Sequence, residues 1–294
     1  MEFVANLVDS SIDPAAWAQV REDEGWHVVS VADHVADRGR TYPHVWVAAG
    51  AMAAATSTVR IASAFANNLL RSPVDVAHAG LAVQQASGGR FELGLGAGWS
   101  QPEVEGSGLR YPPPGERVER YAEALQIVST LLETRHCRFS GTYYQIDIGP
   151  IGPPVDTPPT LTASLGGPRS IALCAALVSR VEVKITGRVT RGGTLAYGDL
   201  ASIDDAHVVD LVERVRRANP DAALSTFIQV GCGNGERLVT LQRDLEGSFL
   251  GRFIGEPDRV ANALFDLERF GFDRVLLTPY TPDSLDVLAP AILP

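Results

Sequence analysis

The segment that decides the fold is RFELGLGAGW, residues 90–99. Apolar side chains occupy one parity of this segment, whereas the other parity carries Gly94, Gly96 and Gly98 towards its end. Glycine weakens a strand because it adds backbone entropy and no side chain to pack. We therefore expect a strand whose last residues allow a close approach to the backbone.

Short apolar segments like this one alternate with longer helical patterns from one end of the chain to the other. Eight strands are predicted, at residues 3–8, 27–32, 59–65, 90–95, 159–164, 180–185, 224–230 and 274–278. Strands that alternate with helices indicate βα units and a parallel sheet. The pattern predicts an α/β fold, a single (β/α)8 TIM barrel domain over residues 1–294, with a doubly wound open sheet as the alternative.

Two segments interrupt the alternation. Residues 136–158 are rich in glycine, proline and aromatic residues, and residues 187–204 form a polar stretch with several glycines. Long connections in a compact domain are uncommon and often functional. We expect insertions after the fourth and sixth strands.

The composition excludes several classes of function. A formal net charge of −10 argues against a general surface for nucleic acid or anionic membranes. Cys137, Cys174 and Cys232 are widely scattered, and no histidine has a partner at ligand spacing, so neither a disulfide scaffold nor a metal site is predicted. The start of the sequence lacks a secretory pattern and no apolar run approaches the ~20 residues of a membrane span, which predicts a cytoplasmic protein.

In a barrel of this kind the active site lies at the C-terminal ends of the strands. Asp33 and His34 end the second predicted strand and are the catalytic candidates. An imidazole can exchange a proton with a substrate near neutral pH. Asp33 should point to the opposite face, so we do not expect a direct pair with His34. The alternative is a histidine that only closes a loop through a hydrogen bond.

Glycines suggest where a ligand lies. The bare face at residues 94–98 could support a planar ring, and Gly166 and Gly167 precede Pro168 at a helix start, where free N–H groups favour an anion. The alternative is that these glycines merely permit close packing. Ser100 and Glu103 have capping-box spacing, so we expect Glu103 to cap its helix.

Several of these segments resemble a known family. VADH (31–34), LLRSP (69–73), SGGRFELGLGAGW (87–99), GERVERYAEALQIVSTLL (115–132) and GGPRSIALCAA (166–176) resemble the luciferase-like monooxygenase superfamily, and most closely its actinobacterial coenzyme F420-dependent oxidoreductases. The resemblance implies a (β/α)8 barrel that binds FMN or the deazaflavin F420 at its C-terminal mouth.

The resemblance also assigns residues to the cofactor. It places a backbone bulge, often with a non-prolyl cis peptide, at Ala64 and Phe65 behind the flavin ring, and His34 near the reactive carbon. The residues that it implies for ring and phosphate are Ala64, Phe65, Gly96, Ala97, Gly98, Trp99, Ser164, Leu165, Gly166 and Gly167. At the position of Trp99, the similar F420-dependent glucose-6-phosphate dehydrogenases have a glutamate that acts as an acid.

The resemblance predicts an oxidoreductase that transfers a hydride between F420 and a small organic substrate. One alternative is a two-component monooxygenase that uses reduced FMN and oxygen; another is a barrel that has lost cofactor binding. The family also implies a homodimer, for which Val45, Trp46 and Met52 could form the face. Arginines that could meet the anionic tail of F420 are Arg38, Arg40, Arg71, Arg188 and Arg191. The sequence names neither the substrate nor the direction of hydride transfer.

Overall fold

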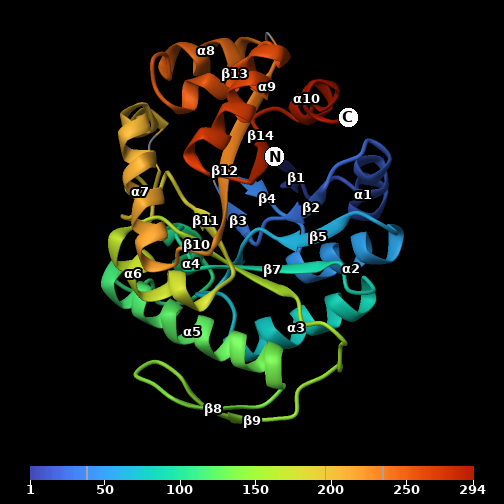
Figure 1. Ribbon diagram of the computed structural model, residues 1–294, viewed down its shortest axis with the longest axis vertical. Coiled ribbons are helices and arrows are strands. Elements are labelled where there is room, and N and C mark those ends of the chain that lie inside the picture. The colour runs from blue at the N-terminus through green and yellow to red at the C-terminus, as the bar shows by residue number, and fades with distance from the viewer. Residues whose placement is uncertain (38, 196, 234) are drawn as a thin grey trace.

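The computed structural model describes residues 1–37, 39–195, 197–233 and 235–294. Eight parallel strands form a closed barrel in which β1 pairs with both β2 and β14 (Figure 1). The barrel strands are β1 (Glu2–Leu7), β2 (Val28–Val31), β5 (Arg60–Ser63), β7 (Phe91–Gly96), β10 (Thr160–Leu165), β11 (Arg180–Val183), β12 (Ala223–Cys232) and β14 (Arg274–Pro279). The predicted (β/α)8 barrel and its eight strands are confirmed, and the open sheet is excluded.

Helices surround the barrel on its outer side (Figure 1). Two of them begin as local chemistry dictates: Asp13 accepts a hydrogen bond from the N–H of Ala15, and Ser72 accepts one from the N–H of Asp75. The α-helices are α1 (Pro14–Asp23), α2 (Val45–Ala55), α3 (Pro73–Ala86), α4 (Gln101–Gly106), α5 (Pro114–Thr134), α6 (Pro168–Cys174), α7 (Asp205–Ala218), α8 (Glu236–Asp244), α9 (Pro257–Phe265) and α10 (Ser284–Ile292).

Both predicted insertions are present. After α5 the chain forms an antiparallel hairpin, β8 (Cys137–Ser140) with β9 (Gln145–Ile148), which lies outside the helical layer at the bottom of Figure 1. The connection after β11 includes a 3-10 helix, η2 (Tyr197–Ser202). A further excursion after β12 carries α8 and a short strand, β13 (Ile254–Gly255), which pairs with β12.

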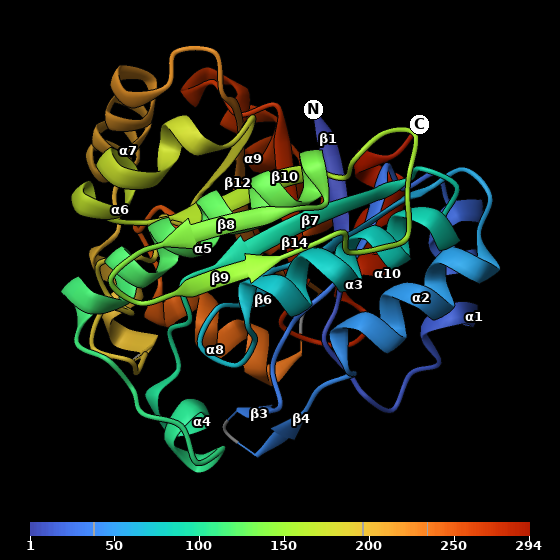
Figure 2. The same ribbon diagram turned by 90° about the horizontal axis from the view of Figure 1, so that it is seen from below.

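A shorter excursion follows β2. Its strands β3 (Ala36–Asp37) and β4 (Arg40–Thr41) form a small hairpin, and α4 contacts β3 (Figure 2). The contact brings the start of α4 next to the residues that follow β2.

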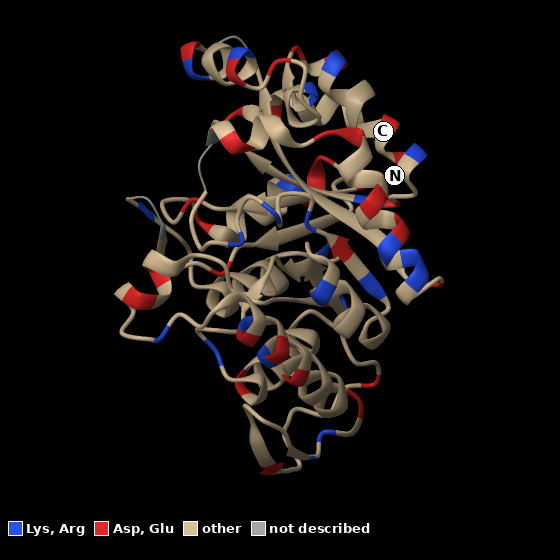
Figure 3. Cartoon of the chain, turned by 90° about the vertical axis from the view of Figure 1, so that its left-hand side faces the viewer, with Lys and Arg blue, Asp and Glu red and all other residues tan. Residues whose placement is uncertain are grey.

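Charged residues close the N-terminal end of the barrel. Glu2, Arg60, Glu92 and Arg274 lie at the starts of their strands and pair with one another; Arg274 donates from Nε to Glu2 Oε2 at 2.8 Å and from Nη2 to Glu92 Oε1 at 3.1 Å. Above them, the barrel interior holds a small apolar cluster that includes Val28, together with buried polar residues such as Thr162 and Ser225. The outer helices and loops carry charges of both signs, as Figure 3 shows from one side.

The surface predicted for a homodimer needs correction. Val45 and Met52 are fully buried against the barrel, and Trp46 is half-buried. On α2 the exposed apolar side chain is Val47. Val45 and Met52 therefore stabilise the single chain and cannot form an interface with a second copy. Within the described residues, no helix has the length and apolar character needed to cross a membrane.

Candidate active site

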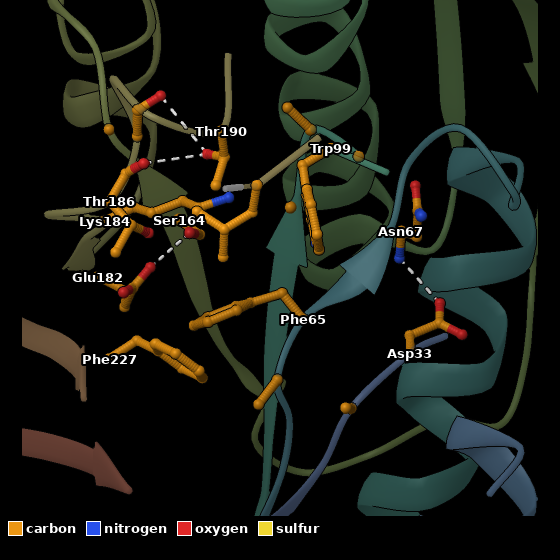
Figure 4. Close-up of a pocket in the computed structure, with 18 of the residues that line it drawn as sticks. Asp33, Phe65, Asn67, Trp99, Ser164, Glu182, Lys184, Thr186, Thr190 and Phe227 are labelled. Atoms are coloured by element: carbon orange, nitrogen blue, oxygen red, sulfur yellow. Dashed lines mark hydrogen bonds between the residues drawn. The ribbon is translucent and has the colours of Figure 1, made fainter. Parts of the chain in front are cut away.

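A cavity of about 790 Å³ opens at the carboxyl ends of the barrel strands, a size typical of small-molecule sites (Figure 4). Each of the eight strands, or the residue just after it, contributes to its wall: Asn6, Ala32, Ala64, Gly96, Ser164, Glu182, Phe227 and Thr278. Asp33 and His34 also line it, as do nine of the ten residues that the resemblance assigns to the cofactor. The exception is Leu165, which is fully buried and is not part of the wall.

Asp33 is held by the chain itself. Its carboxylate accepts hydrogen bonds from the N–H of Asn67 at 2.8 Å and from two guanidinium nitrogens of Arg71 at 2.8 Å each (Figure 4). These bonds raise the pKa of Arg71 above its usual value. As expected, Asp33 does not pair with His34. Its position indicates that it anchors the segment after β5, while Arg71 is already engaged and does not serve as a free anion-binding group.

His34 forms a close pair with Glu103. Its Nδ1 lies 2.9 Å from Glu103 Oε2, and the other carboxylate oxygen accepts the N–H of Val35 at 2.6 Å. The Glu103 side chain is 1% exposed and that of His34 19%. Because an ionised carboxylate only accepts, Nδ1 carries the proton and exchange with a ligand would go through Nε2.

The predicted role of Glu103 as a helix cap is wrong. The side chain of Ser100 makes no capping bond, and Glu103 turns to His34 and Val35 instead. The sequence could not reveal this pair, because 69 residues separate its members and it depends on α4 lying beside β3.

The chain itself covers part of the glycine face of β7. A Cβ on Gly94 would lie 2.2 Å from the carbonyl oxygen of Ser63 and 2.6 Å from the ring of Phe65. Gly98 has φ +79°, and a Cβ there would lie 2.6 Å from Asn67 Oδ1. Residues after β5 therefore fill the space beside Gly94 and Gly98, as in the close-packing alternative, while Gly96 and Gly98 also line the cavity.

The segment that fills this face has the shape implied by the resemblance. The Ala64–Phe65 peptide bond is cis, and the strand β6 (Ala66–Asn67) pairs with the end of β7. Phe65 and Phe227 both line the cavity, and Figure 4 draws their rings in the lower part of the view. The floor of the cavity is therefore aromatic.

The turn before α6 differs in part from the predicted anion site. The N–H of Gly167 bonds to Ser170 Oγ at 3.2 Å, so it is not free for a ligand. The Oγ of Ser164 donates to Glu182, so this hydroxyl proton is also used. Gly166 packs tightly on Gly187, because a Cβ added to Gly166 would lie 2.8 Å from the Cα of Gly187.

The arginines expected near the mouth divide into groups. Arg40 and Arg191 line the cavity, and Arg191 Nη2 lies 3.8 Å from the place of a Cβ on Gly167. Arg188 bonds to the carbonyl of Ser202. Arg38 lies outside the described residues.

Two residues of the site were not identified from the sequence, Glu182 in β11 and Lys184 just after it. Glu182 is 1% exposed, and its Oε1 has no hydrogen-bond partner among the residues described. The Nζ of Lys184 lies 5.5 Å from the centre of the Trp99 ring. Burial raises the pKa of Glu182 and lowers that of Lys184, and their mutual attraction opposes both shifts.

A metal centre finds no support in the described part of the chain. No group of three or more His, Cys, Asp or Glu side chains there could hold a metal ion. The three cysteines are free and buried. The site therefore consists of a His–Glu pair, an aromatic floor, a Glu–Lys pair and several arginines.

Comparison with known proteins identifies relatives in sequence and in fold. An F420-dependent glucose-6-phosphate dehydrogenase of Beutenbergia cavernae is 31% identical over 167 residues, which cover 55% of this chain and 49% of that protein. The matched segment thus spans about half the length of the curated relative. Two solved structures cover 99–100% of this chain and 99% of their own: an F420-dependent secondary alcohol dehydrogenase in complex with an F420–acetone adduct (TM-score 0.75, 18% identity) and the monooxygenase RslO1 from Streptomyces bottropensis (TM-score 0.77, 16% identity).

At these identities the solved structures establish the shared fold alone. The family is established by sequence, because the profile of the luciferase-like monooxygenases matches residues 13–184, more than half of the chain. The protein belongs to the luciferase-like monooxygenase family.

Proposed function

We propose that this protein is an oxidoreductase that transfers a hydride between coenzyme F420 and a small organic substrate in the cavity at the barrel mouth. The observation that carries the proposal is His34, which lines a cavity large enough for a tricyclic ring and is held by Glu103 behind it. The relative named as an F420-dependent glucose-6-phosphate dehydrogenase supports the choice of cofactor.

The residues present fit such a group. The aromatic side chains of Phe65 and Phe227 offer an apolar surface to a flat ring, while Arg40 and Arg191 supply positive charge for an anionic tail. The deazaflavin, when bound, would donate or accept the hydride. The chain supplies position and electrostatics.

His34 is the proposed acid–base group. Glu103 fixes the tautomer and the orientation of the ring, so that Nε2 can give a proton to the substrate or take one from it. Asp33 acts indirectly, by holding the segment of Phe65 through Asn67 and Arg71. We assign no catalytic step to Asp33.

The FMN-dependent monooxygenase is the second candidate, supported by the fold shared with RslO1. Titration of the pure protein with F420 and with FMN, read by fluorescence quenching, separates the two. Tighter binding of F420 supports our proposal, and tighter binding of FMN overturns it. If neither binds at micromolar concentration, the barrel has lost its cofactor.

Two matters of organisation are also proposed. We propose that residues 1–294 form a single domain, and that two copies associate through a surface other than Val45 and Met52. Limited proteolysis tests the first statement. Sedimentation velocity tests the second, and a single monomer peak at all concentrations would contradict it.

A further inference from the structure

The proposed reaction leaves Glu182 and Lys184 without a role. They are two positions apart on one strand, so both side chains leave β11 on the face that lines the cavity (Figure 4). Within the described residues, Lys184 has no carboxylate within 4.0 Å, although it shares the cavity with Glu182. An ammonium group without a carboxylate partner in the wall of a cavity favours an anionic group that arrives with the ligand, and Glu182, buried beside it, is costly in its charged form.

The surroundings define the shape of that ligand. Trp99 presents its ring to Lys184, and Phe65 and Phe227 lie below Glu182 in Figure 4. Leu195 also lines the cavity. Aromatic and apolar walls around two charged groups suit a flat apolar body that carries one polar end.

The charge of the cavity defines the polar end. The chain as a whole is acidic, with a net charge of −10, yet the wall of the cavity is basic. Its acidic residues are Asp33, which Arg71 neutralises, and Glu182. The cations in the wall are Arg40, Arg117, Arg169, Lys184, Arg191 and Arg237, of which Arg169 pairs with Glu119. An excess of positive charge inside a concave wall attracts anions even when the whole surface is acidic.

We propose that Glu182 and Lys184 form a subsite for the carboxylate of a small aromatic or unsaturated organic acid, which takes up one proton from solvent onto Glu182 as it binds. Lys184 then donates to the bound carboxylate, while protonation of Glu182 removes the buried negative charge that would repel it. The identification of this acid as the substrate rests on the proposed function, whereas the subsite itself does not.

The proton balance follows from the groups that face the pair. Without the ligand, Glu182 and Lys184 together hold one proton whether they are both charged or both neutral. Arg117 faces Lys184 and lowers its pKa, and Ser164 donates to Glu182. The phenol of Tyr121 also feels Glu182, but it stays protonated because burial raises its pKa well above the usual value. A bound carboxylate adds one negative charge that favours protonation of both members.

The test uses the full chain and a matched pair of probes, benzoate and the uncharged benzamide. Because Lys184 lies on the ring of Trp99, binding should change tryptophan emission, and Trp99→Phe should remove that change. Calorimetry in two buffers with different enthalpies of ionisation gives the number of protons taken up. At a pH midway between the pKa values of Glu182 (about 7) and Lys184 (about 8), we expect benzoate to bind with uptake of close to one proton and benzamide to bind more weakly with none.

Variants assign the effect to the two residues. Lys184→Met should weaken benzoate by about tenfold or more and abolish the preference over benzamide, whereas Lys184→Arg should restore part of it. Glu182→Gln should retain benzoate binding but lose the proton uptake. Arg180→Met is the matched control, since it removes a cation from the opposite end of the same strand and should leave benzoate affinity unchanged.

Three results would overturn the subsite: equal affinity for the two probes in the wild type, unchanged benzoate affinity in a folded Lys184→Met, or no proton uptake. The titrations are run without cofactor and with F420. Benzoate binding as predicted together with no F420 binding would refute the proposed function and keep the subsite. F420 binding without any of the benzoate effects would refute the subsite and keep the proposed function.

Discussion

The two ends of the barrel handle charge in different ways. At the N-terminal end, Glu2, Arg60, Glu92 and Arg274 satisfy one another in a closed network. At the C-terminal end, Glu182 keeps an oxygen without a partner, although it is as deeply buried as any member of that network. A fold that can pair buried charges at one end leaves them unpaired at the other because a ligand completes them there. This matches the general division of such barrels into a stabilising end and a functional end.

The strongest test of this contrast removes the acid–base group at the mouth. His34→Ala should lower kcat by about 10²- to 10⁴-fold, because a positioned proton donor contributes that much, while F420 affinity stays the same. Steady-state kinetics and fluorescence titration measure the two quantities. Glu103→Gln, which only changes how His34 is held, should cost less. Normal turnover in His34→Ala would show that the role of the imidazole is structural.

The second test breaks the network at the other end. Arg274→Met leaves Glu92 and Glu2 without their main partner and should lower the free energy of unfolding by about 3–5 kcal/mol. Urea denaturation measures the loss, and cofactor affinity should not change in the folded fraction. Lys184→Met is the control at the mouth, with little change in stability. If the two variants were equally destabilised, the contrast between the ends would be lost.

The third test concerns the layer between the ends. Gly94→Ala would place a methyl group against Ser63 and Phe65, and overpacking of this kind costs about 1–3 kcal/mol. Gly50→Ala is the matched control, because Gly50 lies in α2 with nothing within 4 Å of its added Cβ. Its gain in helix propensity should stabilise the protein by about 0.5–1 kcal/mol. Thermal denaturation compares them; a neutral Gly94→Ala would mean that the bulge after β5 shifts freely.

The smallest expected effect is a shift in titration. Burial lowers the pKa of Lys184, and attraction to Glu182 raises it in part, so Glu182→Gln should lower that pKa further. The pH dependence of Trp99 emission reports the midpoint. A midpoint that stays in place or rises would mean that the two side chains do not interact.

The lowered pKa of Lys184 also makes the free energy of unfolding depend on pH. Between its lowered pKa in the folded protein and its ordinary value of about 10.4, Lys184 binds fewer protons folded than unfolded. Stability contributed by this residue therefore rises with pH across that window. Lys184→Met should remove the rise, as urea denaturation at several pH values would show.

The strands and the place of the site could be predicted from the sequence, since buried parallel strands are continuous apolar runs and their ends are local features. The predicted end of the second strand thus placed His34 at the barrel mouth, where it lines the cavity. The partner of His34 could not be predicted, because Glu103 has a plausible local role as a helix cap and its contact depends on tertiary packing. The glycines of β7 predict a close approach to the backbone of this strand. The groups that approach Gly94 and Gly98 are the residues after β5.

The sequence does contain a pattern that places Glu182 and Lys184 on the inner face of the barrel. In RVEVKI, residues 180–185, charged residues alternate with valines along a strand that belongs to a barrel. The valines pack outward against helices, so the charged parity must face the interior. The alternation gives the direction of the side chains, but their burial and the missing partner of Glu182 emerge only in three dimensions.

Lys184 is the sole lysine of the chain, and the amino terminus pairs with Glu268. An acylating or aldehyde reagent therefore meets one ε-amine, and that amine stands in the ligand cavity with a depressed basicity that keeps more of it nucleophilic. The protein thereby carries a natural attachment point for a covalent affinity label, at which any molecule that fills the barrel mouth can be scored by the protection it gives.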